Sequence, residues 1–151
     1  MLVEPNDPGN LGTIVRTADA AGADGVLVDG GVDPYNGKCV RASAGSLFHL
    51  PVLECAAAEL LITAEDSGLQ ALATSGDGAV DLDDLIDLGE LDQPTLWLFG
   101  TEAHGLPNSV LEAADQTVRI PMHGRAESLN LAAAAAVCLY ASARAQRRGR
   151  P

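Results

Sequence analysis

Basic side chains are missing from the middle of this sequence. Residues 51–118 hold fourteen Asp and Glu residues and neither Lys nor Arg, and the whole chain has a net charge of −12 at pH 7. Nucleic acid binds basic surfaces, so this charge argues against a nucleic-acid-binding protein whose surface is basic throughout. All nine bases lie in residues 1–50 and 119–151. If the fold brings these two segments together, one face is basic. Charge alone favours the alternative, an acidic solvated surface with a basic tail.

Cysteines, histidines and long apolar stretches are also scarce, and each scarcity excludes a class of protein. The three cysteines are odd in number and far apart, which indicates reduced thiols in a cytoplasmic protein rather than disulfides. The histidines show no metal-ligand spacing with them, so no metal is expected. No apolar run reaches 18 residues and no signal-peptide pattern opens the chain, so no membrane span is expected. The cysteines are Cys39, Cys55 and Cys138, and the histidines are His49, His104 and His123.

The sequence does contain an alternation of strand-like and helix-like segments. With 151 residues, of which 47% are hydrophobic, the chain has room for one core, and no linker or repeat divides it. We therefore expect residues 1–151 to form a single α/β domain with a mostly parallel sheet flanked by helices. The expected strands are 1–3, 25–28, 51–54, 69–74, 95–99 and 116–120. The expected helices are 11–22, 38–44, 56–66, 81–88, 107–113 and 128–147.

Three loops carry unusual residues where predicted strands end. They are residues 6–12, with Arg16 one helical turn further on, residues 100–105, and residues 120–130. In open α/β sheets, ligands bind beyond the carboxyl ends of the strands, so these loops are the expected site. No Gly-x-Gly-x-x-Gly pattern is present, so none is a dinucleotide fingerprint. Taken singly, each has an ordinary explanation, since Asn10 or Ser128 can cap a helix and Glu102 can face solvent.

Together the three loops resemble the three motifs of the SpoU (TrmH-like) RNA ribose 2′-O-methyltransferases, within the SPOUT superfamily. The first motif matches Asn10, Gly12 and Arg16, the second matches Gly100, Glu102 and Gly105, and the third matches IPMHGRAESLN at 120–130. VRASAG at 40–45 also looks like the family. The resemblance covers nearly the whole chain in the right order. One departure is Ala132, where members often carry a serine, and we expect it to affect helix packing more than chemistry.

The resemblance implies the SPOUT methyltransferase fold, whose parallel α/β sheet has a deep trefoil knot at its C-terminal end. It also implies S-adenosyl-L-methionine as cofactor, bound in a pocket formed by the second and third loops. In the family, Gly100 lets the backbone approach the cofactor. The main chain around it lines the adenine and ribose, so small and apolar side chains suffice. The implied cofactor-binding residues are Leu98, Gly100, Ile120, Met122 and Leu129, with Thr74 a weaker candidate.

The implied reaction is transfer of a methyl group to a ribose 2′-hydroxyl of RNA. The family assigns the proton-acceptor role to Arg16, although free arginine has a pKa of about 12.5–13.8 and is nearly always charged. Arg16 can instead bind the adjacent phosphate and stabilise developing negative charge, and both roles stay open. The resemblance implies that four further residues orient Arg16 and the ribose, while His104 and His123 lie outside the motifs and are interpreted as incidental. These four are Asn10, Glu102, Ser128 and Asn130.

The resemblance further implies that the partner is tRNA or rRNA and that the enzyme is a homodimer. The apolar 129–143 helix suits a subunit interface, and any N-terminal RNA-binding domain is expected to lie outside this chain. A second hypothesis is a catalytically silent RNA- or nucleotide-binding module of the same fold. Retention of four motif residues speaks against it, because a silent copy has no chemical reason to keep all of Arg16, Glu102, Ser128 and Asn130. A third, an unrelated α/β metabolic enzyme, would require three motif matches by chance.

Overall fold

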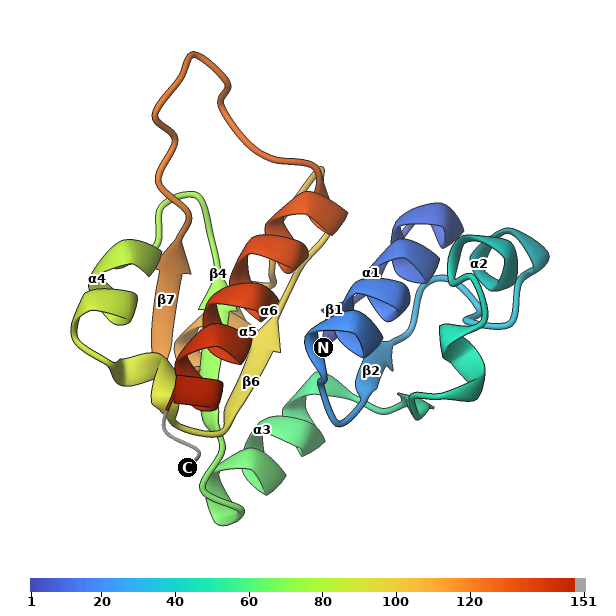
Figure 1. The fold of residues 1–151 in the computed structure, drawn as a ribbon, viewed down its shortest axis with the longest axis horizontal. Coiled ribbons are helices and arrows are strands. Elements are labelled where there is room, and N and C mark those ends of the chain that lie inside the picture. The colour runs from blue at the N-terminus through green and yellow to red at the C-terminus, as the bar shows by residue number, and fades with distance from the viewer. Residues whose placement is uncertain (149–151) are drawn as a thin grey trace.

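The structure is a computed structural model that describes residues 1–148 (Figure 1). Its strands are β1 (Leu2–Val3), β2 (Val26–Asp29), β3 (Val52–Glu54), β4 (Gln70–Thr74), β5 (Val80–Asp81), β6 (Thr95–Leu98) and β7 (Gln116–Arg119). Its helices are α1 (Pro8–Ala21), α2 (Gly37–Ala42), α3 (Ala57–Asp66), α4 (Leu82–Asp87), α5 (Asn108–Ala113) and α6 (Leu131–Arg148). Two 3₁₀ turns, η1 (Ser46–Phe48) and η2 (Glu90–Asp92), complete the described part.

The strands form two parallel groups that meet at β1 and β6. One group has the order β1-β2-β3 and the other β5-β7-β4-β6, and every strand pairing in both is parallel. Leu2 pairs with Phe99, where the Val3 amide donates to the Phe99 carbonyl at 2.9 Å and the Phe99 amide donates to the Met1 carbonyl at 3.0 Å. The expected parallel α/β sheet is thus confirmed. Strand order does not test the trefoil knot, which stays a prediction.

Helices cover both faces of this sheet because its strands are apolar on both sides. Successive strand residues point to opposite faces, so Leu72 and Trp97 pack in one buried cluster while Ala73 and Leu98 pack in the other. The first cluster lies under α1 and α6, and the second lies under α3 and α5. Strands buried on both faces are typical of parallel sheets.

Helix α1 begins and ends where local chemistry dictates. The Asp7 carboxylate accepts a hydrogen bond from the Gly9 amide at 3.0 Å, and Pro8 occupies the first turn, where its missing N–H costs nothing. At the other end Gly22 adopts a left-handed conformation with φ of 78°. We expected this helix to begin at residue 11, but it begins at Pro8, so residues 8–12 of the first predicted loop are helical.

The C-terminal helix α6 starts later than predicted. We expected it to begin at Ser128, but it begins at Leu131 because the Asn130 side chain caps it, accepting from the amides of Ala132 at 2.9 Å and Ala133 at 3.3 Å. Ser128 is therefore not the cap. Strand β5 was also missed, since two residues are too short to show a periodic pattern.

The two end segments that carry the bases do pack together. Figure 1 shows α6 beside α1, and Arg147 Nη2 donates to the Ala21 carbonyl at 3.3 Å. Arg150 lies outside the described residues. Residues 1–148 include no helix that is long and apolar enough to cross a membrane. The cysteines of this part are free thiols, with Cys39 and Cys138 buried and Cys55 half-buried.

Candidate active site

The three predicted loops lie at the carboxyl ends of the strands they follow. Residues 4–7 leave β1 and lead into α1, residues 99–107 leave β6, and residues 120–130 leave β7 and lead into α6. Because neighbouring strands are parallel, these exits share one edge of the sheet, as Figure 1 shows. The prediction that the loops share an edge is confirmed.

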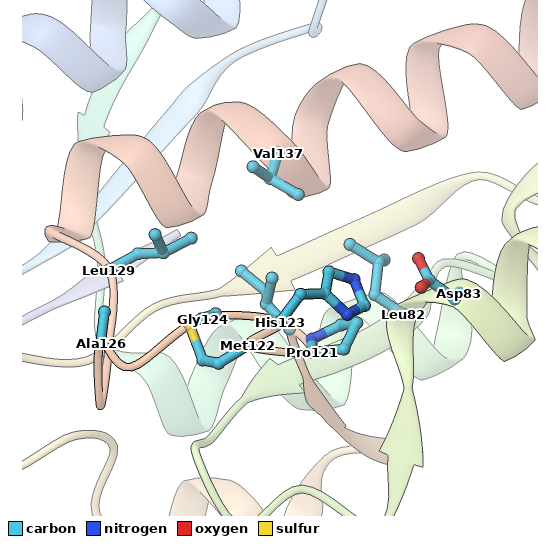
Figure 2. A pocket seen from close by; sticks show the side chains of 10 residues that line it. Leu82, Asp83, Pro121, Met122, His123, Gly124, Ala126, Leu129 and Val137 are labelled. Carbon is cyan, nitrogen blue, oxygen red and sulfur yellow. The ribbon is translucent and has the colours of Figure 1, made fainter.

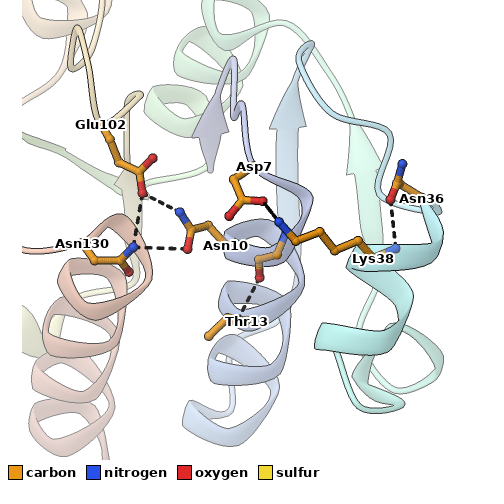
Figure 3. A network of polar contacts seen from close by, with 8 residues as sticks. Asp7, Asn10, Thr13, Asn36, Lys38, Glu102 and Asn130 are labelled. Carbon is orange, nitrogen blue, oxygen red and sulfur yellow. Dashed lines mark hydrogen bonds and ion pairs between the residues drawn. The ribbon is translucent and has the colours of Figure 1, made fainter.

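One residue from each loop joins a single polar cluster. Asn10 Nδ2 donates to Glu102 Oε1 at 2.5 Å, and Asn130 Nδ2 lies 3.3 Å from both Glu102 Oε1 and Asn10 Oδ1 (Figure 3). Residues 92 and 28 positions apart in the sequence are thereby held in fixed orientations. The carboxylate acts as an acceptor for two amides, which is an anchoring role rather than that of a free base. All three bonds are solvent-exposed, so a substrate can reach the cluster.

Arg16 and Ser128, the other two predicted catalytic residues, are not joined to this cluster. Arg16 lies on α1 six residues beyond Asn10, about 9 Å further along the helix axis. Its side chain is exposed and makes no hydrogen bond or ion pair within residues 1–148. Ser128 is exposed in the 120–130 loop and likewise makes no hydrogen bond within the described chain. Arg16 is thus free to meet a phosphate or a ribose hydroxyl.

A lysine that sequence reasoning missed extends the polar network on the other side of α1. Lys38 Nζ of α2 lies 2.5 Å from Asp7 Oδ1, the residue that caps α1 (Figure 3). Hydrogen bonding from Lys38, followed by that from the Gly9 amide, lowers the pKa of Asp7 below its ordinary value. The polar network therefore runs from α6 across α1 to α2. No sequence motif links positions 7 and 38, so only the fold brings them together.

An apolar hollow of about 430 Å³ opens beside the third loop (Figure 2). Ligand pockets commonly have volumes of about 300–1,000 Å³, so an adenosine-sized molecule fits. Three predicted cofactor-binding residues, Ile120, Met122 and Leu129, line it. The other lining residues are Leu82, Asp83, Pro121, His123, Gly124, Ala126 and Val137.

Four of these lining residues were not predicted as part of the cofactor pocket. Leu82 and Asp83 come from α4 and Val137 from α6, and no motif marks them. His123, which we interpreted as incidental, is also part of the wall, whereas the backbone amide of His104 only donates to Thr101 Oγ1 at 3.1 Å. Among the described residues no group of His, Cys, Asp and Glu side chains could hold a metal ion.

Thr74, Leu98 and Gly100 do not line the hollow. Thr74 Oγ1 donates to the Leu98 carbonyl at 2.9 Å, and Leu98 is fully buried. A Cβ on Gly100 would lie 2.1 Å from the Gly105 carbonyl carbon and oxygen, so the glycine is needed for the chain to fold back on itself. The pairing of Thr101 with Gly105 closes that turn. We expected the glycine for close approach of the backbone to the cofactor, and the structure gives this other reason. The roles of Thr74, Leu98 and Gly100 in cofactor binding stay predictions.

Comparison with known proteins agrees with the motif assignment. A profile described as the SpoU rRNA Methylase family matches residues 1–140. The chain belongs to this family. Among relatives of the SpoU family, it is 40% identical to the 23S rRNA (uridine(2479)-2′-O)-methyltransferase of Streptomyces viridochromogenes, over 97% of this chain and 52% of the relative. It is 38% identical to the 23S rRNA (guanosine(2553)-2′-O)-methyltransferase RlmP of Bacillus subtilis, over 89% of this chain and 53% of the relative. The chain thus spans about half the length of these curated relatives.

Solved structures, one of them of a SpoU methyltransferase, match the fold. The crystal structure of the SpoU methyltransferase AviRb from Streptomyces viridochromogenes in complex with AdoMet has a TM-score of 0.83 and 37% identity, covering 99% of this chain and 57% of that one. A structure described as giving insights into the 2′-OH methylation of C/U34 on tRNA has a TM-score of 0.82 and 32% identity, covering 99% of this chain and 95% of that one. The second comparison is with a protein of nearly the same length.

Proposed function

We propose that this chain transfers a methyl group from S-adenosyl-L-methionine to a ribose 2′-hydroxyl of tRNA or rRNA. The observation that carries the proposal is the Asn10–Glu102–Asn130 cluster, which unites one residue of each family motif. Leu129, which lines the hollow, directly precedes Asn130 of the cluster. The named activities of the relatives and the adenosine-sized hollow support the same reaction. These observations favour methyl transfer over the catalytically silent module, and no specific observation supports that module.

The chain's own residues have three tasks in this reaction. S-adenosyl-L-methionine supplies an electrophilic methyl group on a sulfonium ion. The hollow binds the adenosine and excludes water, through the apolar side chains of Ile120, Met122 and Leu129. The polar cluster orients the ribose so that its 2′-oxygen faces the methyl group, which is the alignment that direct displacement requires. As the new oxygen–carbon bond forms and the carbon–sulfur bond breaks, the hydroxyl proton must leave.

We propose that Arg16 assists that loss of the proton. Its guanidinium has no partner within residues 1–148 that would hold it away from substrate. One role is to accept the proton, and the other is to bind the adjacent phosphate and stabilise negative charge on the 2′-oxygen. Ser128, exposed in the third loop, is proposed to position the ribose with the cluster. Thr74, Leu98 and Gly100 are proposed to shape the backbone that contacts the cofactor.

The test is calorimetry with S-adenosyl-L-methionine, followed by methylation of bulk tRNA and rRNA with labelled cofactor. We expect binding and the transfer of label to ribose 2′-oxygens. Absence of cofactor binding by the folded chain would contradict the proposal. Binding without transfer to either RNA would favour the silent module.

We further propose that two copies pack through α6. Its outer stripe, Ala133, Val137 and Tyr140, is exposed and apolar, with Tyr140 53% exposed. We expect a dimer by light scattering at micromolar concentration and a monomer for Tyr140→Glu. Leu88→Glu, at an apolar residue that is 70% exposed at the C-terminal cap of α4, should remain dimeric.

Three further properties belong to the same proposal. Residues 1–151 form one methyltransferase domain with a C-terminal trefoil knot, and any separate RNA-binding domain lies outside this chain. The enzyme needs no metal, and it works in the cytoplasm, where its free thiols stay reduced. Full activity in the presence of a chelator would support the metal-free reaction, and loss of activity on chelation would contradict it.

A further inference from the structure

The part of the chain around α2 has no acidic residue. Residues 34–53 contain neither Asp nor Glu but include Lys38 and Arg41. With Arg16 these are the bases that precede Arg119 in the sequence. Arg41 makes no ion pair within residues 1–148, and Lys38 pairs with an exposed carboxylate, which leaves its other N–H groups available.

The same stretch exposes two of the few aromatic side chains. The chain has one Trp, two Tyr and two Phe, of which Trp97 and Phe99 are buried and stacked on each other. Tyr35 is 67% exposed and Phe48 is 86% exposed, and they lie at the two ends of residues 35–48, which we call the α2 segment. An exposed aromatic ring offers a face on which a nucleic-acid base can stack.

The α2 segment packs directly against the helix that carries the site. A Cβ on Gly12 of α1 would lie 2.4 Å from the Cys39 carbonyl oxygen, so the two helices are in close contact. The ion pair of Lys38 ties α2 to Asp7, three residues before Asn10 of the polar cluster (Figure 3). Arg16 lies one helical turn beyond Gly12, on the side of α1 that faces the α2 segment. In Figure 1, α1 lies between α6 and α2.

Cations next to exposed aromatic rings fit single-stranded nucleic acid better than a duplex. Lys and Arg pair with phosphates, and aromatic rings stack on bases only where these are not already stacked in a duplex. An acidic protein can bind RNA through such a restricted basic surface. Its remaining acidic surface repels the RNA phosphates, so the RNA is directed to the basic surface.

We propose that the α2 segment binds an unpaired RNA segment next to the methylated nucleotide. Tyr35 and Phe48 stack on bases, while Lys38 and Arg41 contact the phosphates that lead to Arg16. This inference rests on the proposed function and specifies the substrate as RNA that is single-stranded around the target.

The first test compares binding of a fluorescently labelled, unstructured single-stranded RNA oligonucleotide with binding of a duplex RNA of equal length. By fluorescence anisotropy, we expect the single strand to bind more tightly to the wild-type chain. Tyr35→Ala and Phe48→Ala should each weaken single-strand binding about tenfold. Leu88→Ala, which also removes an exposed apolar side chain but at the C-terminal cap of α4, should change it less than twofold. Wild-type affinity in both aromatic variants, or tighter duplex binding, would overturn the inference.

The second test measures the dependence of affinity on salt. Removing one phosphate contact from single-stranded RNA lowers the slope of log affinity against log salt by about 0.7. We expect this change for Arg41→Gln and none for Arg144→Gln, an exposed arginine on α6. An unchanged slope for Arg41→Gln would remove the α2 segment from the RNA path.

Calorimetry with S-adenosyl-L-methionine on the same proteins separates this inference from the proposed function. We expect the Tyr35, Phe48 and Arg41 variants to bind the cofactor as the wild type does, which also shows that they fold. If the wild-type chain methylates RNA and none of the three changes alters RNA binding, only the inference is overturned. A wild-type chain that binds neither cofactor nor RNA would overturn both.

Discussion

The polar cluster and the apolar hollow lie at the same edge of the sheet, but they are built in opposite ways. Side-chain hydrogen bonds between three distant loops hold the cluster together. The hollow is bounded largely by the 120–130 loop, whose residues from Met122 to Asn130 are all exposed. The cluster is thus preorganised, whereas the wall of the hollow depends on a surface loop. Changes in the cluster should therefore affect turnover, and changes around the hollow should affect cofactor affinity.

The largest expected effect comes from a change that breaks both regions. Gly100→Val places a side chain against the backbone of Gly105 and displaces the turn that carries Glu102, and Gly100 is itself proposed to shape the backbone that contacts the cofactor. We expect cofactor affinity to fall about 10²-fold or more, together with a stability loss of about 2–3 kcal/mol, as measured by calorimetry and thermal unfolding. Gly76→Ala is the control, because no atom lies within 4 Å of its Cβ position. Unchanged affinity in Gly100→Val would separate this turn from the cofactor site.

The next change should affect the chemistry and spare the hollow. Arg16→Ala is expected to lower single-turnover methylation about 10²-fold or more, the scale of a lost general base or charge-stabilising donor. Its affinity for S-adenosyl-L-methionine should stay the same, since Arg16 does not line the hollow. Arg16→Lys distinguishes the two roles. Recovery of much of the rate indicates a phosphate-binding charge, and little recovery indicates the planar guanidinium or proton acceptance. A wild-type rate in Arg16→Ala would exclude a catalytic role.

A pair of substitutions at Asn130 separates the structural contribution of the cluster from its chemical one. Asn130→Ala removes the cap of α6 and should reduce stability by about 1 kcal/mol. Asn130→Asp keeps an oxygen for the cap but loses the donor to Glu102 and puts two carboxylates side by side. We expect Asn130→Asp to melt near the wild-type temperature yet to turn over about tenfold more slowly. Equal turnover in Asn130→Asp and wild type would make Asn130 a cap only.

The smallest expected effect concerns the charge at the hollow. Asp83 is its one lining carboxylate, and S-adenosyl-L-methionine carries a sulfonium charge that the demethylated product lacks. Asp83→Asn should weaken cofactor binding about two- to fivefold and leave product binding unchanged, because an exposed charge pair contributes about 0.2–1 kcal/mol. The neighbouring Asp84→Asn is the control, since Asp84 is also exposed but does not line the hollow. Equal effects of both changes would point to general surface charge.

Local chemistry made much of the fold predictable. The end of helix α1 could be placed because Gly22 is a capping residue in the position that a helix end requires, whereas its start, capped by Asp7, lies three residues before the predicted one. The parallel sheet followed from apolar strands alternating with helices, and the three loops fell at one edge because parallel strands point the same way. The resemblance to the family's motifs then singled out Asn10, Glu102 and Asn130 before any contact between them was known, and with them Arg16 and Ser128, which do not join the cluster.

Only the tertiary structure decided which of these residues meet and why each is needed. The sequence did not show that Lys38 reaches Asp7 or that Asn130 lies beside Asn10 and Glu102. It also gave no sign that Asp83 and Val137 share a wall with Met122. Capping, turns and periodicity act over a few neighbouring residues, so a sequence displays them directly. Contacts between residues tens of positions apart depend on how whole helices and strands pack, and that packing exists only once the chain has folded.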